Sequence, residues 1–339
     1  MNLIHMIVFS ACVFFFSFIL TRFLIQFAKK KNIIDVPNDR SSHDKPTPRG
    51  GGLSISLSIL IYLIVIIIIK EGLTTQNYSL LGIGAVIISI IGILDDVKNL
   101  SATIRAFLYL STSSIFILLI TKFTYISFQE IVFISVAILG ITGLTNLYNF
   151  MDGADGIAGI QAIIAALPAG ILFYVLNEYE FALLCFTLVA STTGFLIWNW
   201  PPARIFMGDV GSCALGFIFG GLIFITYLQK SISINIWLVL LSFFIVDATL
   251  TLIKRVINRE RWYQAHRSHA FQRYLQMGHS HTQLAITVSL FSVLILWPAT
   301  FLAYKIPEFQ LHITIIIYLF LSFIWYFIQQ KYKQSHLNG

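Results

Sequence analysis

The segment NFMDGADG, residues 149–156, places two aspartates three positions apart between two long apolar runs, 128–145 and 157–176. Each run is close to the roughly 20 apolar residues that a helix needs to cross a hydrocarbon core about 30 Å thick. Because a charged side chain near hydrocarbon is costly, an acidic pair at this boundary indicates a functional site. Glycines beside each aspartate let a ligand approach the backbone closely. The segment therefore predicts two membrane-spanning helices joined by a polar, ligand-binding loop.

Similar apolar runs recur along the whole chain of 339 residues, of which 57% are hydrophobic and 11% charged. This composition excludes a soluble domain and predicts an all-α polytopic membrane protein. With no clear internal repeat and no long polar region, residues 1–339 are expected to form a single integral membrane domain. We predict eleven membrane spans, at 3–27, 52–69, 78–94, 103–121, 128–145, 157–176, 181–198, 212–228, 234–252, 283–303 and 311–329.

The net charge of +7 is unevenly distributed along the chain. All but four of the 22 Lys and Arg residues lie in the C-terminal tail or in or beside alternate loops, at 28–51, 95–102, 146–156, 199–211 and 253–282. Basic loops stay in the cytoplasm, so this bias predicts an outside N-terminus and a cytoplasmic C-terminus. The basic excess also attracts anionic headgroups and phosphates, and nucleic acid is not expected as a partner.

The third predicted helix ends in Asp95-Asp96, followed by Arg105 one turn into the next helix. Adjacent carboxylates repel each other unless a cation is near, and an acidic pair at a helix C-terminus opposes the helix dipole. Neighbouring helical residues point about 100° apart, so one Asp could hold a metal while the other faces a substrate. A solvated pair at a helix end is the alternative.

The first inside loop carries Arg40, Lys45 and Arg49 and ends in three glycines, 50–52, that open the second helix. Exposed N–H groups at such a helix start, with cations beside them, favour a phosphate. An ordinary basic loop with turn residues is the alternative.

The fourth inside loop holds Phe206 and Asp209 just before the eighth helix. Asp209 is a second acidic site at a helix terminus, or else simply an N-cap. Phe206 is expected to pack at the membrane interface or to stack on a flat base.

The last inside loop contains His266, Arg267 and His269. Histidines three positions apart share a helix face, and with Arg between them they suit a diphosphate. A zinc site is the rival interpretation, but no Cys or Glu completes a tetrahedral set at ordinary spacing.

Three further residues near this loop carry expectations of their own. His279 and His281 are expected at the surface near the start of the tenth helix. Asp247 lies inside the ninth helix, where an acid is a functional candidate by default, and we expect it to pair with Lys254 or Arg255.

The predicted cytoplasmic face thus gathers five acids and many phosphate-binding groups, with no thiol among them: Asp95, Asp96, Asp152, Asp155 and Asp209. Hard oxygen ligands of this kind predict Mg²⁺ or Mn²⁺. A metal, anion-binding arginines and a membrane location together indicate phosphoryl transfer that involves a lipid.

Three motifs of the inside loops carry a family resemblance: Asp95-Asp96, Asn146-x-x-Asn149-Phe150-x-Asp152-Gly-x-Asp155-Gly, and Phe206-Met207-Gly208-Asp209-x-Gly-Ser. Together they resemble the polyprenyl-phosphate N-acetylhexosamine-1-phosphate transferases of glycosyltransferase family 4, relatives of phospho-N-acetylmuramoyl-pentapeptide translocase. The match spans all five inside loops. The first loop and the segment HRSHAFQ, residues 266–272, look closer to the subgroup that initiates O-antigen or capsule chains.

The resemblance implies that the single domain is an integral membrane transferase of the bacterial cytoplasmic (inner) membrane. It would use a UDP-N-acetylhexosamine and undecaprenyl phosphate to give undecaprenyl-diphosphate-sugar and UMP. Membrane lipid is then a partner, and a homodimer is a further expectation.

The resemblance also implies residue roles at the reaction centre. Asp209 would bind Mg²⁺ in a site shared with Asp95 and Asp96. Asp95 would deprotonate the attacking lipid phosphate or keep it deprotonated. The other implied roles are contacts with the substrates. The nucleotide would be held by Asn149, Asp152 and Asp155, and the uracil would stack on Phe206. The diphosphate or sugar would contact His266, Arg267 and His269.

The chain departs from the family pattern at several positions. Pentapeptide translocases carry three consecutive histidines where this chain has His-Arg-Ser-His, which favours a plain amino sugar as substrate. Thr103 stands where the family often has Lys, and the third residue after Asp96 is Asn99. Either Arg105 or Lys98 would then supply the missing charge.

Two other functions fit some of these features. A membrane transporter of phosphorylated lipid or solute could use the same charged loops, although the chain lacks the repeats of many transporters. A phosphotransferase that uses CDP-alcohols would need a different spacing of acids.

Overall fold

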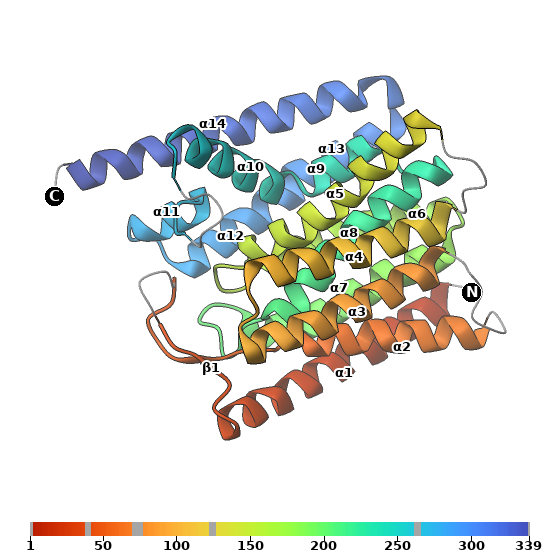
Figure 1. The fold of residues 1–339 in the computed structure, drawn as a ribbon, viewed down its shortest axis with the longest axis horizontal. Helices are drawn as coiled ribbons and strands as arrows, with labels where there is room; N and C mark the ends of the chain where they lie inside the picture. Colours follow the sequence, from red (N-terminus) through yellow and green to blue (C-terminus); the bar gives the residue numbers. More distant parts are fainter. Residues whose placement is uncertain (1–2, 38–41, 70–76, 122–126, 261–265, 338–339) are drawn as a thin grey trace.

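The computed structural model describes residues 3–37, 42–69, 77–121, 127–260 and 266–337. Most residues within these ranges are helical, and the long helices run broadly along one direction (Figure 1). The helices are α1 (Leu3–Lys30), α2 (Leu53–Ile69), α3 (Asn77–Lys98), α4 (Ala102–Thr121), α5 (Phe128–Met151), α6 (Ile157–Val175), α7 (Tyr179–Asn199), α8 (Asp209–Gln229), α9 (Ile234–Leu240), α10 (Ser242–Ile257), α11 (Ala270–Gln276), α12 (His281–Phe291), α13 (Trp297–Lys305) and α14 (Gln310–Leu337).

Four short elements complete the described chain. A π-helical segment, Ser292–Leu296, joins α12 to α13, and a 3-10 turn, Pro307–Phe309, precedes α14. The strands β1 (Ile34–Asp35) and β2 (Thr47–Pro48) form an antiparallel pair within the first inside loop.

The helices agree with the apolar runs of the sequence. Nine helical segments of the described chain are long and apolar enough to cross a membrane. The continuous segment His281–Lys305, which contains α12 and α13, counts as one of them. Of the two other predicted spans, 52–69 corresponds to the shorter helix α2, and 234–252 is broken into α9 and α10, whose axes differ by 80°. The fold is therefore that of an all-α polytopic membrane protein, while the number of crossings and their orientation stay predictions.

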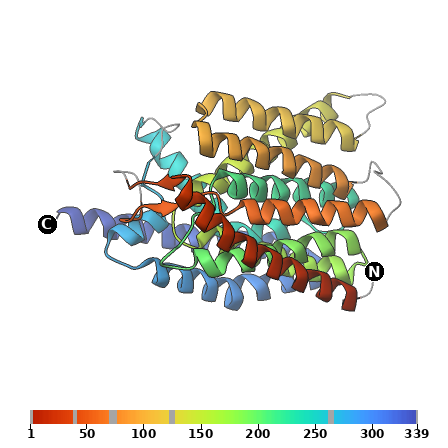
Figure 2. The ribbon, with the colours of Figure 1, turned by 90° about the horizontal axis from the view of Figure 1, so that it is seen from below.

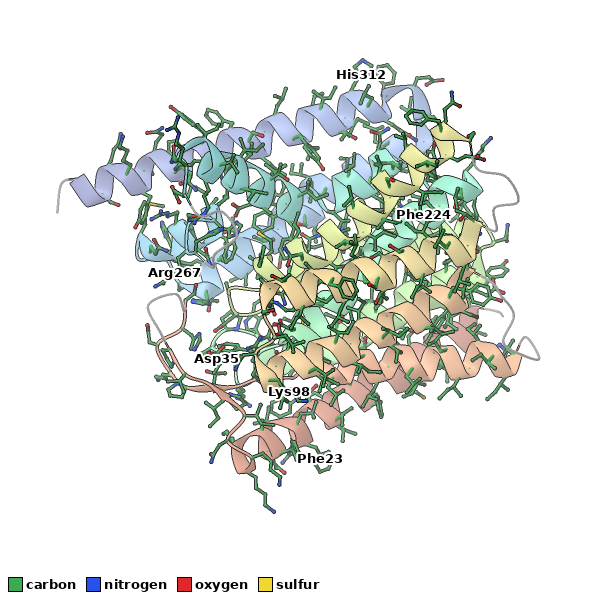
Figure 3. All side chains as sticks on the ribbon, viewed as in Figure 1. Phe23, Asp35, Lys98, Phe224, Arg267 and His312 are labelled. Carbon is green, nitrogen blue, oxygen red and sulfur yellow. The ribbon has the colours of Figure 1, made fainter. Side chains whose placement is uncertain are left out.

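The outer surface of the bundle is apolar. Large hydrophobic side chains such as Phe23 on α1 and Phe320 on α14 are exposed, and Figure 3 shows Phe23 projecting from the edge of the molecule. Figure 2 shows α1 lying obliquely across the bundle, with the two termini at opposite ends. Side chains of this kind on a bundle of apolar helices are suited to contact with lipid.

The centre of the bundle is α8, most of whose side chains are buried. It packs between α3 and α5 at glycine contacts, which let helix backbones approach closely. A Cβ atom at Gly92 of α3 would lie 2.5 Å from the carbonyl oxygen of Asp209, and one at Gly216 of α8 would lie 2.7 Å from that of Leu144. This close packing brings the polar ends of α3, α5 and α8 together.

The close approach of α3 to α8 is testable at Gly92. Gly92→Ala should destabilise the protein by about 1–3 kcal/mol, since the added methyl group would meet backbone atoms that cannot rotate away. The measurement is the thermal unfolding midpoint of the purified protein in detergent.

The matched control is Gly140→Ala in α5, because a Cβ atom there would have no neighbour within 4 Å. It should leave stability unchanged or raise it by up to about 1 kcal/mol, as expected for Gly→Ala in a helix. Equal midpoints for the two variants would contradict the packing described here.

Candidate active site

Three carboxylates meet where the C-terminal end of α3 touches the start of α8. The side chains of Asp95, Asp96 and Asp209 are 7%, 6% and 8% exposed. Asp95 and Asp96 are therefore buried, and the alternative of a solvated pair at a helix end is wrong. Because buried carboxylates are costly without partners, the groups that surround them define the site.

Two arginines bridge these carboxylates. Arg49, from the first inside loop, contacts Asp209 and lies 2.8 Å from Asp96. Arg105 of α4 lies 2.8 Å from Asp95 and 3.3 Å from Asp209. Burial tends to lower the pKa of Arg49, but the charges of Asp96 and Asp209 raise it above its ordinary value, so the guanidinium stays protonated. The cluster holds three negative and two positive side chains.

Backbone groups fix two of the acids. Asp96 accepts hydrogen bonds from the N–H groups of Asp209 (3.0 Å) and Val210 (3.3 Å), at the first turn of α8. A carboxylate at this position also interacts favourably with the helix dipole. Asp209 is thus not the N-cap of α8, a position that Gly208 occupies, and its own carboxylate is free to face the arginines. Asp95 accepts from the N–H of Leu100 (2.7 Å), which fixes the turn after α3.

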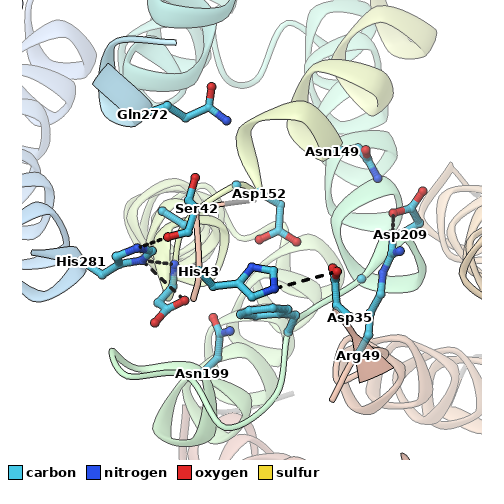
Figure 4. Close-up of a pocket in the computed structure, with 15 residues that line it drawn as sticks. Asp35, Ser42, His43, Arg49, Asn149, Asp152, Asn199, Asp209, Gln272 and His281 are labelled. Carbon is cyan, nitrogen blue, oxygen red and sulfur yellow. Dashed lines mark hydrogen bonds and ion pairs between the residues drawn. The ribbon is translucent and has the colours of Figure 1, made fainter. Parts of the chain in front are cut away.

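The end of α5 presents Asn149 and Asp152 to the same region. The Asn149 amide donates towards Ser212 Oγ and Cys213 Sγ of α8, both at 3.2 Å. Asp152 ends α5, and its carboxylate points into the cavity beside the cluster (Figure 4). Burial raises the pKa of Asp152 well above its usual range, and the nearby charge of Asp209 raises it further. A cation or a hydrogen-bond donor in the cavity would favour its charged form.

The cavity itself measures about 400 Å³, a volume typical of pockets for small ligands. It is open to solvent, and four loop regions that are distant in the sequence contribute its walls. They supply the lining residues Asp35, Ser42, His43 and Arg49; Asn149, Asp152, Gly153, Ala154 and Asp155; Asn199, Phe206, Gly208 and Asp209; and Gln272 and His281.

Phe206 lies on one wall, in a loop that is joined to the first inside loop by main-chain hydrogen bonds. Its N–H donates to the carbonyl of Pro48 (2.8 Å), and its own carbonyl accepts from Gly51 (2.9 Å). The ring is partly exposed and meets the imidazole of His43 edge to face, with centroids 4.7 Å apart. The imidazole in turn lies 3.9 Å from Asp35. The ring of Phe206 is thus partly open to the cavity.

Asp155 links three loops through His281. Its carboxylate accepts from the N–H of Ala203 (2.9 Å), and its own N–H donates to His281 Nδ1 (3.1 Å). The other ring nitrogen of His281 lies 2.9 Å from the carbonyl of Ser42, so the neutral ring that donates from Nε2 satisfies both contacts. His281 is therefore part of the cavity wall, and its predicted place at the surface is wrong, whereas His279 is exposed as expected.

The segment with His266, Arg267 and His269 lies apart from this cavity. The two histidines are not on one helix face, because they precede α11 in irregular backbone, yet their rings are 4.9 Å apart. Burial, together with the adjacent His269 and Arg255, lowers the pKa of His266 to about 4. None of the three lines the cavity, and their role in substrate binding stays a prediction.

Asp247 has a structural task that the sequence does not reveal. It accepts hydrogen bonds from the N–H groups of Ala270 (2.8 Å) and Phe271 (3.2 Å), at the start of α11. Lys254 instead donates to Gln329, and Arg255 pairs with Glu260. Asp247 therefore does not pair with either cation as expected. It caps the start of α11 instead, and this helix contains Gln272, which lines the cavity.

The carboxylates have the chemistry of a site for a hard divalent cation, since all the donors are oxygens. Across the ranges that the structure describes, no group of three or more His, Cys, Asp or Glu side chains is arranged to hold a metal ion. The two guanidinium groups lie between the three carboxylates and offset two of their negative charges. Oxygen donors of this kind suit Mg²⁺ in their chemistry, while their present arrangement around two guanidinium groups is not that of a metal site, so Mg²⁺ stays a prediction.

Comparisons with known proteins relate the chain to a family of transferases. Residues 78–227 match the model of glycosyl transferase family 4. A probable undecaprenyl-phosphate N-acetylglucosaminyl 1-phosphate transferase of Bacillus subtilis is 29% identical over 287 residues, which cover 80% of this chain and 78% of the relative. An undecaprenyl-phosphate alpha-N-acetylglucosaminyl 1-phosphate transferase of Thermotoga maritima is 29% identical over 202 residues, 59% of each chain.

A shorter similarity connects the chain to a second group of enzymes. A phospho-N-acetylmuramoyl-pentapeptide-transferase of Geobacillus sp. is 38% identical over 82 residues, 24% of each chain. The family model covers α3 to α8 and so includes Asp95, Asp96, residues 149–156 and Asp209. These similarities confirm the resemblance drawn from the motifs, and residues 78–227 are similar to glycosyl transferase family 4.

Proposed function

We propose that the protein transfers N-acetylhexosamine 1-phosphate from a UDP-sugar to undecaprenyl phosphate, with release of UMP. An oxygen of the lipid phosphate would attack the phosphorus that carries the sugar, and the bond from this phosphorus to UMP would break. The observation that carries the proposal is the convergence of Asp95, Asp96 and Asp209 with two arginines at a cavity open to solvent, in a chain similar to family 4.

The charges of the cluster suit the proposed reaction. A nucleotide diphosphate brings negative charge, which Arg49 is placed to meet because it lines both the cavity and the cluster. Phosphoryl transfer depends mainly on positioning and on stabilising this charge. Mg²⁺, held by Asp209 with Asp95 and Asp96, would neutralise the diphosphate. In this proposal Asp95 keeps the attacking lipid phosphate deprotonated, and Arg105 holds Asp95 in place.

The opposite side of the cavity suits the nucleoside. Phe206 offers a ring face to uracil, while Asn149 and Asp152 supply polar groups from the end of α5. Asp155 is already bound to Ala203 and His281, so it would shape the donor site as much as contact the donor. The names of the relatives from Bacillus subtilis and Thermotoga maritima favour N-acetylglucosamine as the first sugar to test. Initiation of O-antigen or capsule chains in the bacterial inner membrane is the cellular role that we propose.

The proposal predicts that purified protein releases UMP from UDP-N-acetylglucosamine only when undecaprenyl phosphate and Mg²⁺ are both present. Chelation of the metal with EDTA should stop the release, and added Mg²⁺ or Mn²⁺ should restore it. The measurement is nucleotide chromatography together with extraction of the lipid product. A panel of UDP-N-acetylhexosamines should be tested in parallel, and release of no UMP from any of them would favour the transporter.

Asp209→Asn should lower turnover more than about 100-fold, because even the groups that merely orient metal ligands contribute about 10- to 100-fold. The substitution keeps the side-chain volume, so the protein should still elute as a folded species in detergent. Asp44→Asn is the matched control, since Asp44 is an exposed acid of the first inside loop that does not line the cavity. Near-normal turnover of Asp209→Asn would remove Asp209 from the reaction centre.

Phe206→Ala should raise the KM for the UDP-sugar about tenfold, with a smaller effect on the KM for the lipid, because stacking on a base contributes about 1–3 kcal/mol. Phe206→Tyr preserves the ring face and should stay close to the parent protein. An unchanged donor KM in the alanine variant would contradict stacking.

A further inference from the structure

A second cavity, of about 520 Å³, lies between α10, α11 and the C-terminal half of α14. These three helices come together in the upper left of Figure 1, and Figure 3 labels one of the lining residues, Arg267. The cavity shares no lining residue with the candidate active site. It is called the α10–α14 pocket below.

The lining of the α10–α14 pocket is strongly cationic. It includes Lys254, Arg255, Arg267 and Arg273 but a single acid, Glu260. Glu260 lies 2.8 Å from Arg255, so one carboxylate partly offsets four cations. Like charges that are partly removed from water repel one another, and a bound anion would relieve this repulsion.

Hydrogen bonds from neighbouring segments hold these cations in place. Gln329 of α14 accepts from Lys254 (2.9 Å) and donates to the carbonyl of Ser268 (2.9 Å). Gln276 accepts from Arg273 (3.2 Å) and donates to the carbonyl of Arg267 (2.9 Å). The pocket is thus a preorganised arrangement, in which fewer side chains lose conformational entropy when a ligand binds.

Arg273 retains donor capacity towards a ligand. Its guanidinium lies 3.7 Å from the centre of the Tyr332 ring, which orients the group. Its Nε atom is buried and has no hydrogen-bond partner among the described residues. An unsatisfied buried donor on a charged group is costly, and an acceptor oxygen in the pocket would remove this cost.

The position of the pocket indicates where such an anion comes from. Lys254 lies near the end of α10, and Tyr332 follows the apolar run 311–329 of α14, so both mark the predicted cytoplasmic boundary of the membrane. On the outer surface of α10, Val256 and Ile257 are 52% and 73% exposed beside the cations. A charged pocket next to an exposed apolar surface matches a molecule with a phosphate head and acyl chains.

We propose that the α10–α14 pocket binds the phosphate group of an anionic membrane phospholipid, at a site separate from the reaction centre. The cations contact the phosphate oxygens, and the acyl chains follow the apolar surface of α10. Free inorganic diphosphate offers the same chemistry without the chains, so the test includes both.

The test uses the full chain in a neutral detergent and native mass spectrometry. Phosphatidylglycerol, phosphatidylcholine and inorganic diphosphate are added separately to the parent protein and to the double variant Lys254→Gln/Arg273→Gln. Each cation near a membrane surface contributes about 1 kcal/mol, so loss of both should weaken phosphatidylglycerol binding about thirtyfold. Phosphatidylcholine should bind weakly to both proteins.

The control variant is Lys30→Gln, which removes an exposed cation from the same predicted face but far from the pocket in the sequence. It should bind phosphatidylglycerol as the parent does. Should the double variant fail to fold, Arg273→Gln alone is measured, with about a fivefold loss expected. A selective loss of diphosphate binding would support the pocket with a soluble anion as its ligand.

Equal phosphatidylglycerol and diphosphate binding by the parent and the pocket variants would overturn the proposal. Because the readout is binding and not UMP release, the result stands whether or not the proposed transferase activity is found.

Discussion

The bridging of three buried carboxylates by Arg49 and Arg105 is the interaction on which the polar face of the protein depends. Removal of one partner from a buried ion pair costs several kcal/mol, because the remaining charge has no solvent to stabilise it. Each arginine comes from a different segment, the first loop or α4, and each contacts Asp209 at the start of α8. The cluster therefore holds the first loop, α3, α4 and α8 together by charge at the point where their apolar packing ends.

The apolar part of the bundle makes this cluster possible. Gly92 allows α3 to approach the first turn of α8 so closely that Asp96 reaches the N–H groups of Asp209 and Val210. Wider spacing would leave those donors and the carboxylate unsatisfied, a costly outcome away from water. The contact between α3 and α8 thus determines both the helix packing and the position of the Asp96 carboxylate. The α10–α14 pocket lies outside this arrangement, and its described lining has four cations and one acid.

Much of the fold and part of the site could be predicted from the sequence, since hydropathy reports directly on burial in lipid. Hydropathy located the apolar runs, and the charged motifs identified Asp95, Asp96, Asp209 and both bridging arginines. Hydropathy does not report tertiary partners, however. The bend between α9 and α10 carries no Pro or Gly, and the capping role of Asp247 depends on a helix 23 residues away. The places of His281 and His43 in the cavity wall were missed because no sequence pattern separates such a histidine from a surface histidine.

One feature of the cavity wall bears on how such proteins diversify. The first loop and the segment before α8 are joined through main-chain atoms, from Phe206 to Pro48, from Gly51 to Phe206 and from Gly52 to Met207. These bonds do not use the side chain of Phe206, whereas Gly51 and Gly52 have no room for a side chain. Phe206, which lines the cavity, can therefore be exchanged for another side chain while the main-chain bonds that join the two loops are kept. In Phe206, the side chain faces the ligand cavity while the main chain holds the two loops together.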